Sequence, residues 1–311
     1  MVLNLVIAAA ALFVFIGGLR VMRSGLEAMV DSRLPALLHT LARTPGRGIL
    51  TGVVITAAVQ SSAAITAAAV GLVASGSMAF RDALGIVLGA NVGSTVTPQL
   101  LTFDLTAAAV VTLFLGTAAW LLGGPRIRPL ARALCGFSCI FIAIHALERA
   151  LQPVAATAWF HGWLQETAGS PWLALVTGCL ASGLVQSSTV VTVIAMALAA
   201  DGALPVDAGI AIVFGANIGT CITSVIASIG QSRPAQQVAL AHVLLNVGGA
   251  LAFLPFLGPY TALMARLAEG AAQQIANAHT VFNLLCTLAV WPVAGPFARL
   301  VEWLLPEHGH A

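Results

Sequence analysis

Long apolar segments follow one another along most of the chain, separated by short connections that contain Arg residues. The first segment, Val2 to Leu19, is about as long as a helix that crosses a bilayer. Residues Ser24 to Ala42 place apolar side chains near helical spacing and predict an amphipathic helix in the membrane interface. Further helices are predicted for Val238 to Leu257 and Ala276 to Trp291, with an interfacial segment, Tyr260 to Gln274, between them. The pattern predicts an all-α integral membrane protein.

The central segments are less regular in length. Gly48 to Ser75 is longer than one perpendicular span requires, and polar residues lie near its middle. This combination predicts a re-entrant hairpin or a broken helix. Ala83 to Leu100 and Leu105 to Leu122 predict two crossings. Leu134 to Leu151 predicts another, which delivers an aromatic cluster at 159–163 to the opposite interface.

Two Arg-rich connections indicate the orientation of these segments. The first contains Arg20, Arg23 and Arg47, and the second contains Arg126 and Arg128. The positive-inside rule places both on the cytoplasmic side. An even number of crossings must then separate them, and a hairpin plus two crossings satisfies this count. The crossing Leu134 to Leu151 comes next, so the second copy starts from the outside, whereas the first starts from the cytoplasmic side.

The polar residues inside the apolar segments occur twice. Gln60-Ser61-Ser62 returns as Gln186-Ser187-Ser188, and the phrase Gly-Ala-Asn-x-Gly at 89–93 returns at 215–219, each time 126 residues later. Two unrelated apolar segments would not share a polar triplet, an Asn and several glycines in one register. The sequence therefore predicts an internal duplication. With the opposite starting sides, the two copies are inverted-topology repeats, an arrangement typical of secondary transporters.

The duplication divides the chain into three expected parts. Residues 1–125 form the first membrane repeat, residues 126–258 form the second, inverted repeat, and residues 259–311 form C-terminal interfacial and transmembrane helices. Each repeat is expected to carry its Gln-Ser-Ser triplet on a re-entrant hairpin or broken helix. No soluble domain is expected after the last helix.

Composition narrows the class of protein. The 311 residues are 59% hydrophobic and 8% charged, with a mean hydropathy of +0.98, whereas soluble domains contain about 25% charged residues. This excludes an ordinary soluble protein and predicts a multi-pass protein of the cell membrane in contact with lipid. The net charge of +2 and the absence of a basic run give no indication of nucleic-acid binding. The five cysteines lie in apolar stretches without metal-ligand spacing, so no transition metal is expected.

The duplicated triplet offers hydrogen-bonding groups at membrane depth, where polar residues are costly without a partner or a role. A helix that breaks at the triplet points free N–H groups and its positive dipole end into the site, which suits an anion. Freed carbonyl oxygens and Ser or Thr hydroxyls are hard ligands that suit Na⁺. The candidate anion-binding residues are Gln60, Ser61, Ser62, Asn91, Gln186, Ser187, Ser188 and Asn217. The candidate cation ligands are Ser62, Thr66, Ser94, Thr95, Thr97, Ser188, Thr189, Thr192, Thr220 and Thr223.

Other interpretations of these residues remain open. Ser and Thr in membrane helices commonly bond their own backbone, and small residues mediate helix packing. Cys221 stands where the first copy has Thr95, so a ligand shell there is asymmetric. Two Ala-His-x-x-x-Asn segments, at 241–246 and 278–283, predict either a gate or proton relay or interhelical hydrogen bonds. Since no Lys or Arg is evident at the midplane, helix ends and Na⁺ are expected to meet the charge of an anion.

These motifs resemble the type II sodium–phosphate cotransporter family, whose hallmark is Gln-Ser-Ser-Ser in each of two inverted repeats, followed by Gly-Ala-Asn-x-Gly-Thr-x-x-Thr. The opening Gly-Gly-Leu-Arg-Val-Met-Arg-Ser-Gly-Leu at 17–26 and the Ala-His-x-x-x-Asn segments are also similar to that family. The chain departs from the hallmark at Ala63 and Thr189, where the third Ser stands in the family. Many bacterial members of the family carry a soluble regulatory domain after the membrane part, and the chain is expected to be a member without it.

The resemblance implies a Na⁺-coupled secondary transporter of inorganic phosphate that works by alternating access, without a cofactor other than the coupling ion. Alternatives are a proton-coupled transporter, using His242 or His279, or a transporter of another small oxyanion. An intramembrane enzyme acting on a lipid phosphate would need a nucleophile, base or metal cluster, which the sequence does not show. No enzymatic activity is therefore expected. A homo-oligomer is compatible with the sequence.

Overall fold

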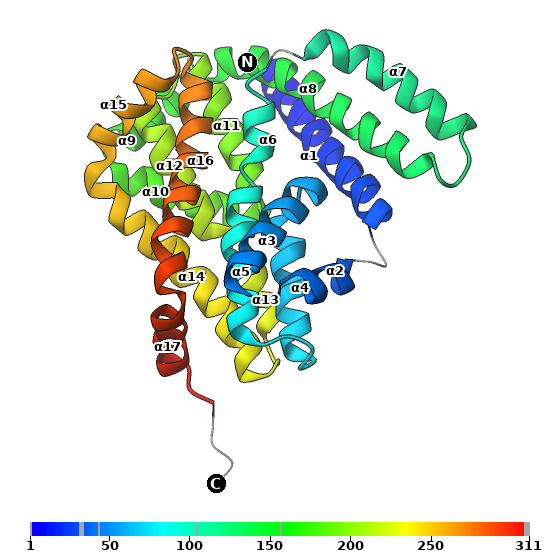
Figure 1. Ribbon diagram of the computed structural model, residues 1–311. Helices are drawn as coiled ribbons and strands as arrows, with labels where there is room; N and C mark the ends of the chain where they lie inside the picture. Colours follow the sequence, from blue (N-terminus) through cyan, green and yellow to red (C-terminus); the bar gives the residue numbers. More distant parts are fainter. Residues whose placement is uncertain (1, 31–33, 43, 104, 156, 308–311) are drawn as a thin grey trace.

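The apolar segments form helices because a helix satisfies its own backbone N–H and C=O groups away from water. The computed structural model describes residues 2–30, 34–42, 44–103, 105–155 and 157–307, and the regular structure in these residues is helical. The all-α fold is thereby confirmed. The helices, arranged as in Figure 1, are α1 (Val2–Val30), α2 (Leu34–Leu41), α3 (Pro45–Val59), α4 (Ser62–Ala74), α5 (Phe80–Gly93), α6 (Val96–Leu100), α7 (Thr106–Leu122), α8 (Arg128–Ala155), α9 (Ala158–Gly169), α10 (Pro171–Val185), α11 (Ser188–Ala200), α12 (Val206–Gly219), α13 (Ile222–Ser228), α14 (Arg233–Phe253), η2 (Leu254–Phe256), α15 (Leu257–Leu267), α16 (Ala271–Val290), η3 (Trp291–Val293) and α17 (Ala294–Leu304).

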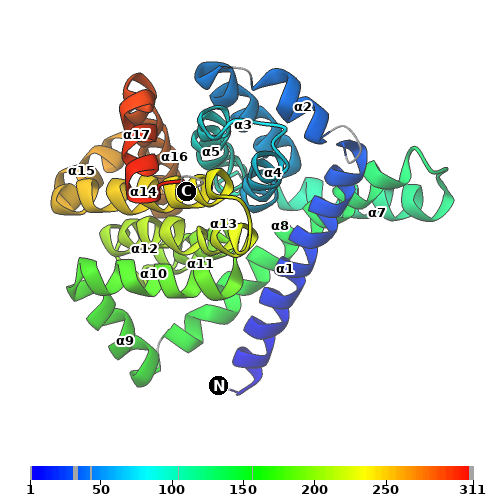
Figure 2. The same ribbon diagram turned by 90° about the horizontal axis from the view of Figure 1, so that it is seen from below.

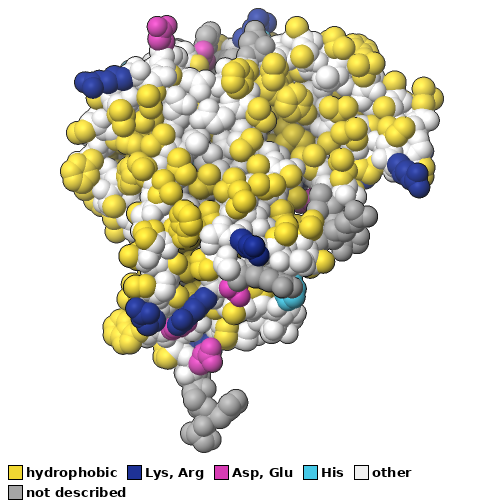
Figure 3. All heavy atoms as spheres, viewed as in Figure 1, with side chains coloured by type: hydrophobic (Ala, Val, Ile, Leu, Met, Phe, Trp, Pro, Cys, Tyr) yellow, Lys and Arg dark blue, Asp and Glu magenta, His cyan; other side chains and the backbone are white. Residues whose placement is uncertain are grey.

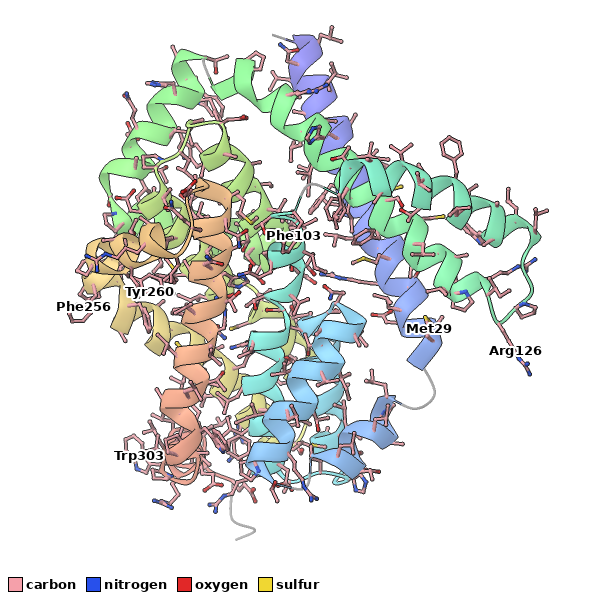
Figure 4. All side chains as sticks on the ribbon, turned by 45° about the horizontal axis from the view of Figure 1, so that its top comes forward. Met29, Phe103, Arg126, Phe256, Tyr260 and Trp303 are labelled. Atoms are coloured by element: carbon pink, nitrogen blue, oxygen red, sulfur yellow. The ribbon has the colours of Figure 1, made fainter. Side chains whose placement is uncertain are left out.

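The surface and the helix lengths are those of a membrane protein. Among the described residues, five helices are long and apolar enough to cross a membrane, or six if the bent pair α9 and α10 forms one span. Hydrophobic side chains cover much of the face in Figure 3, while charged side chains gather mainly near its lower end and its upper and right margins. Phe256 and Trp303 point outward at the periphery (Figure 4) and are 65% and 75% exposed. Such aromatic side chains are suited to contact with lipid.

Helices α1 and α8 pack along much of their lengths and cross the molecule together in Figure 2. Glycines allow this close approach. A Cβ on Gly136 of α8 would lie 2.3 Å from the backbone nitrogen of Met22, and one on Gly25 of α1 would lie 2.5 Å from the carbonyl oxygen of Pro129. Helix α7 packs on α8 and projects outward, with Arg126 at the exposed tip of the turn that joins them (Figure 4).

The two triplets lie at the turns of two helical hairpins, α3–α4 and α10–α11. Each hairpin begins in the same way, with a hydroxyl that caps the first helix and a Pro in the next position: Thr44 accepts a hydrogen bond from the N–H of Arg47, and Ser170 accepts one from Leu173. Such caps satisfy N–H groups that a helix start leaves without partners. The expectation of a broken helix at each triplet is confirmed.

The first arm of each hairpin packs against the helix that follows the hairpin. Helix α3 packs on α5, and α10 packs on α12. A Cβ on Gly89 of α5 would lie 2.0 Å from the carbonyl oxygen of Ile49, and one on Gly215 of α12 would lie 1.8 Å from that of Leu175. The repeated glycines therefore bring the backbones together at equivalent places in both halves.

The structure changes one expectation about the connections and adds one further helix. The predicted interfacial helix Ser24 to Ala42 is not one element, because α1 continues to Val30 and α2 covers Leu34–Leu41, while residues 31–33 lie outside the described part. Packing of α1 on α8 at Gly25 keeps this part of α1 helical. The residues that follow the predicted helix Ala276 to Trp291 form a further helix, α17, in which Ala298 and Val301 are buried where α17 meets α5 and α14.

Candidate functional site

Each helical hairpin turns at its Gln. Gln60 has φ 60° and Gln186 has φ 55°. They are the only non-glycine residues with a positive φ among those that the structure describes. Residues other than Gly, Asn and Asp rarely adopt this left-handed conformation, and positions that hold it cluster at functional sites. The conformation ends α3 and α10 and turns the chain into the next half-helix.

The Ser that follows each Gln starts the second arm of the hairpin. Ser61 Oγ accepts a hydrogen bond of 3.2 Å from the N–H of Ala64, and Ser187 Oγ accepts one of 3.4 Å from Val190. Both serines are extended N-caps, of α4 and α11. The amides of the two residues after each cap have no acceptor within their helix. Each hairpin therefore presents free N–H groups and the positive end of a helix dipole at its turn.

Both turns face one small cavity with a largely polar lining. Its volume is on the order of that needed for one water molecule. A tetrahedral anion can enter only if the surrounding elements move apart. The residues that line the cavity are Arg23, Gln60, Ser61, Ser62, Ala63, Ser94, Gln186, Ser187, Ser188, Thr189 and Thr220.

Arg23 corrects the expectation that no basic side chain lies at the site. The sequence places it in an Arg-rich connection, but α1 continues past it and carries its side chain to the cavity. Its Nε is buried and has no hydrogen-bond partner. A positive charge therefore stands beside both triplets.

The two Gln side chains have different surroundings. Nε2 of Gln60 donates to the carbonyl oxygen of Ala57, and Oε1 of Gln60 accepts from the hydroxyl of Thr97. Gln186 is exposed at the cavity instead, and Thr223, the counterpart of Thr97, donates to the carbonyl oxygen of Thr220 at 2.9 Å. The backbones of the two turns are alike, but only the first Gln is held by the next helix segment.

The two Asn residues predicted to bind the anion do not line the cavity. Asn91 Oδ1 lies 3.2 Å from Nε2 of His242 on α14, and Asn217 Oδ1 lies 3.1 Å from Nε2 of His279 on α16. An anion would take hydrogen bonds from the amide nitrogens rather than from these oxygens. Nδ2 of Asn91 lies 3.4 Å from Oδ1 of Asn246, and Nδ2 of Asn217 is buried without a partner. The assignment of Asn91 and Asn217 to the anion stays a prediction. Of the two interpretations of the His residues, interhelical hydrogen bonding agrees with these contacts.

Several predicted cation ligands bond within the protein. Ser94 donates to the carbonyl oxygen of Asn91 at 2.7 Å, and Thr95 donates to that of Val92 at 2.8 Å. Of the ten candidates, Thr66, Thr95, Thr97, Thr192 and Thr223 lie outside the cavity lining, and Ser62, Ser94, Ser188, Thr189 and Thr220 line it.

Among the described residues, five buried side-chain hydroxyls have no hydrogen-bond partner, and four of them, all except that of Thr261, form two pairs related by the duplication. Thr66 on α4 corresponds to Thr192 on α11, and Thr56 on α3 corresponds to Ser182 on α10. A buried hydroxyl left unpaired costs roughly 1–3 kcal/mol, so an external oxygen-seeking partner fits these positions. Thr56 and Ser182 were not among the predicted ligands, although the constant offset between the copies pairs them.

A second internal repeat is visible in the C-terminal part once the structure is known. The unit α14–η2–α15 returns as α16–η3–α17, 37 residues later. Each unit caps the other, because Gln237 donates to the carbonyl oxygen of Leu305 and Gln274 to that of Ala268, both at 2.9 Å. The Ala-His-x-x-x-Asn segments are one part of this repeat. Its other identical pairs include Gln236/Gln273, Pro255/Pro292, Gly258/Gly295, Pro259/Pro296 and Leu263/Leu300.

These units connect the two halves around the site. Tyr260 of α15, labelled in Figure 4, donates a hydrogen bond of 2.7 Å to the carbonyl oxygen of Ala278, next to His279. On α6, Gln99 donates to Thr280 at 2.9 Å and to Asn277 at 3.2 Å. The described residues contain no group of three His, Cys, Asp or Glu side chains that could hold a metal ion.

Known proteins share this organisation of the sequence. Two segments of the chain, residues 14–149 and 143–286, match the family model described as Na⁺/Pi-cotransporter. The uncharacterized protein YqeW of Bacillus subtilis is 30% identical over 270 residues, which make up 87% of this chain and 88% of YqeW. No solved structure matches the chain.

Two further relatives have names that refer to phosphate. The "Putative inorganic phosphate export protein YjbB" of Salmonella typhimurium is 28% identical over 84% of this chain, which spans 48% of YjbB. The "Sodium-dependent phosphate transport protein 2B" of Rattus norvegicus is 29% identical over 44% of this chain and 20% of its own length. The matched segments begin in α1 and in α8 and each contain one Gln-Ser-Ser hairpin, which fits the inverted-repeat description. The chain belongs to the Na⁺/Pi-cotransporter family.

Proposed function

We propose that this protein is a Na⁺-coupled secondary transporter of inorganic phosphate that works by alternating access. One observation carries the proposal: the N-terminal ends of α4 and α11, from opposite halves of the duplication, open onto the same polar cavity. Two converging helix N-termini bring two positive dipole ends and several free N–H groups to one point. That combination suits a small oxyanion with several acceptor oxygens.

The triplets supply the remaining contacts to the anion. Ser62 and Ser188 lie in the first turns of α4 and α11, and both residues line the cavity together with Gln186. Hydroxyl and amide groups donate hydrogen bonds to phosphate oxygens.

We assign the coupling ion to the four duplication-related hydroxyls that are buried without partners. Thr56 and Thr66 flank the first turn, and Ser182 and Thr192 flank the second. Na⁺ prefers such neutral oxygen ligands beside broken helices. One Na⁺ that moves down 100 mV contributes about 2.3 kcal/mol beyond its concentration gradient. Coupling requires that Na⁺ and phosphate each strengthen the binding of the other.

The difference between the two halves is what alternating access requires. In an inverted repeat, the two access states exchange the conformations of the halves. Here Gln60 is bonded to Thr97, whereas Gln186 is exposed at the cavity. In the opposite state we expect Gln186 to bond near Thr223 and Gln60 to be released.

Direction is a property of the gradients, because a secondary transporter runs either way. The YjbB relatives have names that refer to export, so phosphate efflux is the second candidate activity. It uses the same site.

The test is transport of radiolabelled phosphate by purified protein in liposomes. Inward Na⁺, inward H⁺ and choline conditions are compared at fixed pH, and efflux is measured from preloaded liposomes. Phosphate accumulation that requires the Na⁺ gradient supports the proposal. Accumulation under an H⁺ gradient alone would show that H⁺ rather than Na⁺ is the coupling ion. Preferential transport of sulfate would show that phosphate is not the preferred substrate. Folded protein that transports no phosphate in either direction would contradict the proposal.

A further inference from the structure

We propose that Arg23 binds the transported oxyanion directly and supplies a fixed positive charge at the anion site. This inference rests on the proposed function, since it assigns a ligand to the same cavity. It adds to the anion site a residue that lies outside the duplicated motifs. It also adds a positive charge of the protein itself, where only helix ends and Na⁺ were expected to balance the charge of the anion.

The position of the guanidinium carries the inference. Of the residues that the structure describes, Arg23 is the only charged one that lines the cavity between the triplets. Its Nε is buried and without a hydrogen-bond partner. Glu27, one turn further along α1, acts on Arg23 electrostatically, but no ion pair within 4 Å joins Arg23 to a carboxylate among the described residues.

A buried charge at membrane depth is costly unless something compensates it. The neighbours of Arg23 in the cavity are hydroxyls, amides and two helix N-termini, none of which neutralises a cation. The positive ends of α4 and α11 make the site more favourable for an anion and less favourable for Arg23 alone. An anion bound between the guanidinium and the N-terminal ends of α4 and α11 would interact favourably with the positive charge of Arg23 and with both helix dipoles.

The duplication provides an internal comparison. α1 and α8 begin the two matched segments, and at the same offset of 126 residues Arg23 corresponds to Arg149. Arg149 is exposed and does not line the cavity. The charge therefore breaks the symmetry of the site and comes from the first half alone.

The other asymmetric position in the cavity is on the same side. Ala63 lines the cavity where the second copy has the hydroxyl of Thr189. The first half thus lacks one hydroxyl oxygen in the cavity that Arg23 also lines. Arg23 supplies a positive charge in the half that has fewer oxygen ligands for a cation.

The chemistry selects the class of ligand. A guanidinium has several N–H donors in a planar fork that matches two oxygens of a phosphate, and such charge-assisted pairs are stronger than neutral hydrogen bonds. The unpartnered Nε leaves one edge of that fork available. The preferred ligand is a tetrahedral oxyanion that offers oxygens to Arg23 and to both helix ends at once.

The experiment measures equilibrium binding of radiolabelled inorganic phosphate to the full chain in lipid nanodiscs, with Na⁺ or with choline. The variants are Arg23→Gln, Arg23→Lys and the matched control Arg149→Gln. We expect Arg23→Gln to weaken phosphate binding about 10- to 100-fold, the range of a lost charge-assisted contact. Arg23→Lys retains the charge without the fork and should weaken binding about threefold or more. Arg149→Gln should bind as the wild type does.

The ion dependence gives a second readout that a structural role would not produce. Because the charge of Arg23 is permanent, the wild type should retain measurable phosphate binding in choline, and Arg23→Gln should lose it. Melting temperatures establish that each variant is folded. If Arg23→Gln does not fold, Arg23→Lys decides, and binding equal to the wild type would overturn the inference.

The outcomes separate this inference from the proposed function. Wild-type protein that binds phosphate, with Arg23→Gln indistinguishable from Arg149→Gln, overturns the role of Arg23 and leaves phosphate transport in place. Folded wild-type protein that binds no phosphate under either condition overturns both. Phosphate binding that is lost in Arg23→Gln and kept in Arg149→Gln supports both.

Discussion

Nε2 of His279 lies 3.1 Å from Oδ1 of Asn217, and both side chains are buried. Because an amide oxygen only accepts, the imidazole donates this hydrogen bond. It joins α16 to the end of α12, two residues before that helix stops at Gly219. The equivalent contact, His242 to Asn91, joins α14 to α5 in the other half. The C-terminal units are thereby anchored to the repeats at matching positions.

Replacing His279 with Ala should destabilise the fold. The change leaves the buried amide oxygen of Asn217 without its donor, which costs roughly 1–3 kcal/mol. The melting temperature of the detergent-solubilised protein should fall. His161→Ala, at an exposed position, is the control and should melt as the wild type does. Equal melting of His279→Ala and the control would show that the contact does not contribute.

Ser62→Ala and Gln186→Ala should each reduce phosphate transport about tenfold or more, the effect of removing at least one hydrogen bond to a charged ligand, without changing the amount of protein in the membrane. Gln186 is exposed at the cavity, so its removal leaves the protein's packing intact. Gln60→Ala should also lower stability, because it loses the contacts to Thr97 and Ala57. Transport and melting measured on the same samples separate the two effects. Near-normal transport by Ser62→Ala and Gln186→Ala would contradict the site assignment.

Thr192→Val should weaken Na⁺ activation of phosphate transport without lowering stability. The Thr192 hydroxyl is buried and bonds to no protein atom, and Val has nearly the same shape. If the hydroxyl binds Na⁺, its loss should raise the Na⁺ concentration for half-maximal transport about tenfold, the equivalent of roughly 1.4 kcal/mol. Thr40→Val, at an exposed position of α2, serves as the control. An unchanged Na⁺ concentration for half-maximal transport in Thr192→Val would show that this hydroxyl does not bind the coupling ion.

Gly215→Ala should disrupt the packing of α10 on α12. The added Cβ would lie 1.8 Å from the carbonyl oxygen of Leu175, a contact that only a backbone shift can relieve. Overpacking of this kind costs about 1–3 kcal/mol or more. Gly71→Ala is the matched control, because nothing lies within 4 Å of its Cβ and the second copy has Ala197 there. That control should be neutral or slightly stabilising, since Ala favours helix more than Gly does.

Expression and melting measurements on the two glycine variants test the contact directly. A large fall in melting temperature for Gly215→Ala and none for Gly71→Ala is the expected pair of results. If both variants melt as the wild type does, the approach of α10 to α12 is looser than the structure indicates.

Local sequence was sufficient for the hairpins. A polar triplet in the middle of an apolar run cannot continue as an ordinary lipid-facing helix, so the breaks at Gln60 and Gln186 could be predicted. The constant offset of 126 residues revealed the duplication, and the positions of the Arg residues revealed its inversion. The boundaries proposed for the three parts of the chain remain predictions.

Other features depend on which helices meet. Arg23 belongs to a run of residues that resembles a cytoplasmic connection, and only the packing of α1 on α8 at Gly25 and Gly136 carries it to the cavity. Asn91 and Asn217 are, like the triplets, duplicated polar residues within apolar segments. Their amide oxygens accept hydrogen bonds from histidines of α14 and α16. Neither the position of Arg23 at the cavity nor the histidine partners of the two Asn residues can be predicted from the residues next to them in the sequence.

The sequence by itself determined the class of protein, the duplication, its inversion and the two places where the helices break. These properties follow from the composition and order of residues along each segment, because a bilayer admits only chains that satisfy their backbone locally. The tertiary structure decided the charge of the site, the partners of the two Asn residues and the difference between Gln60 and Gln186. These depend on contacts between segments far apart in the sequence, which close packing at glycines and long-range hydrogen bonds determine.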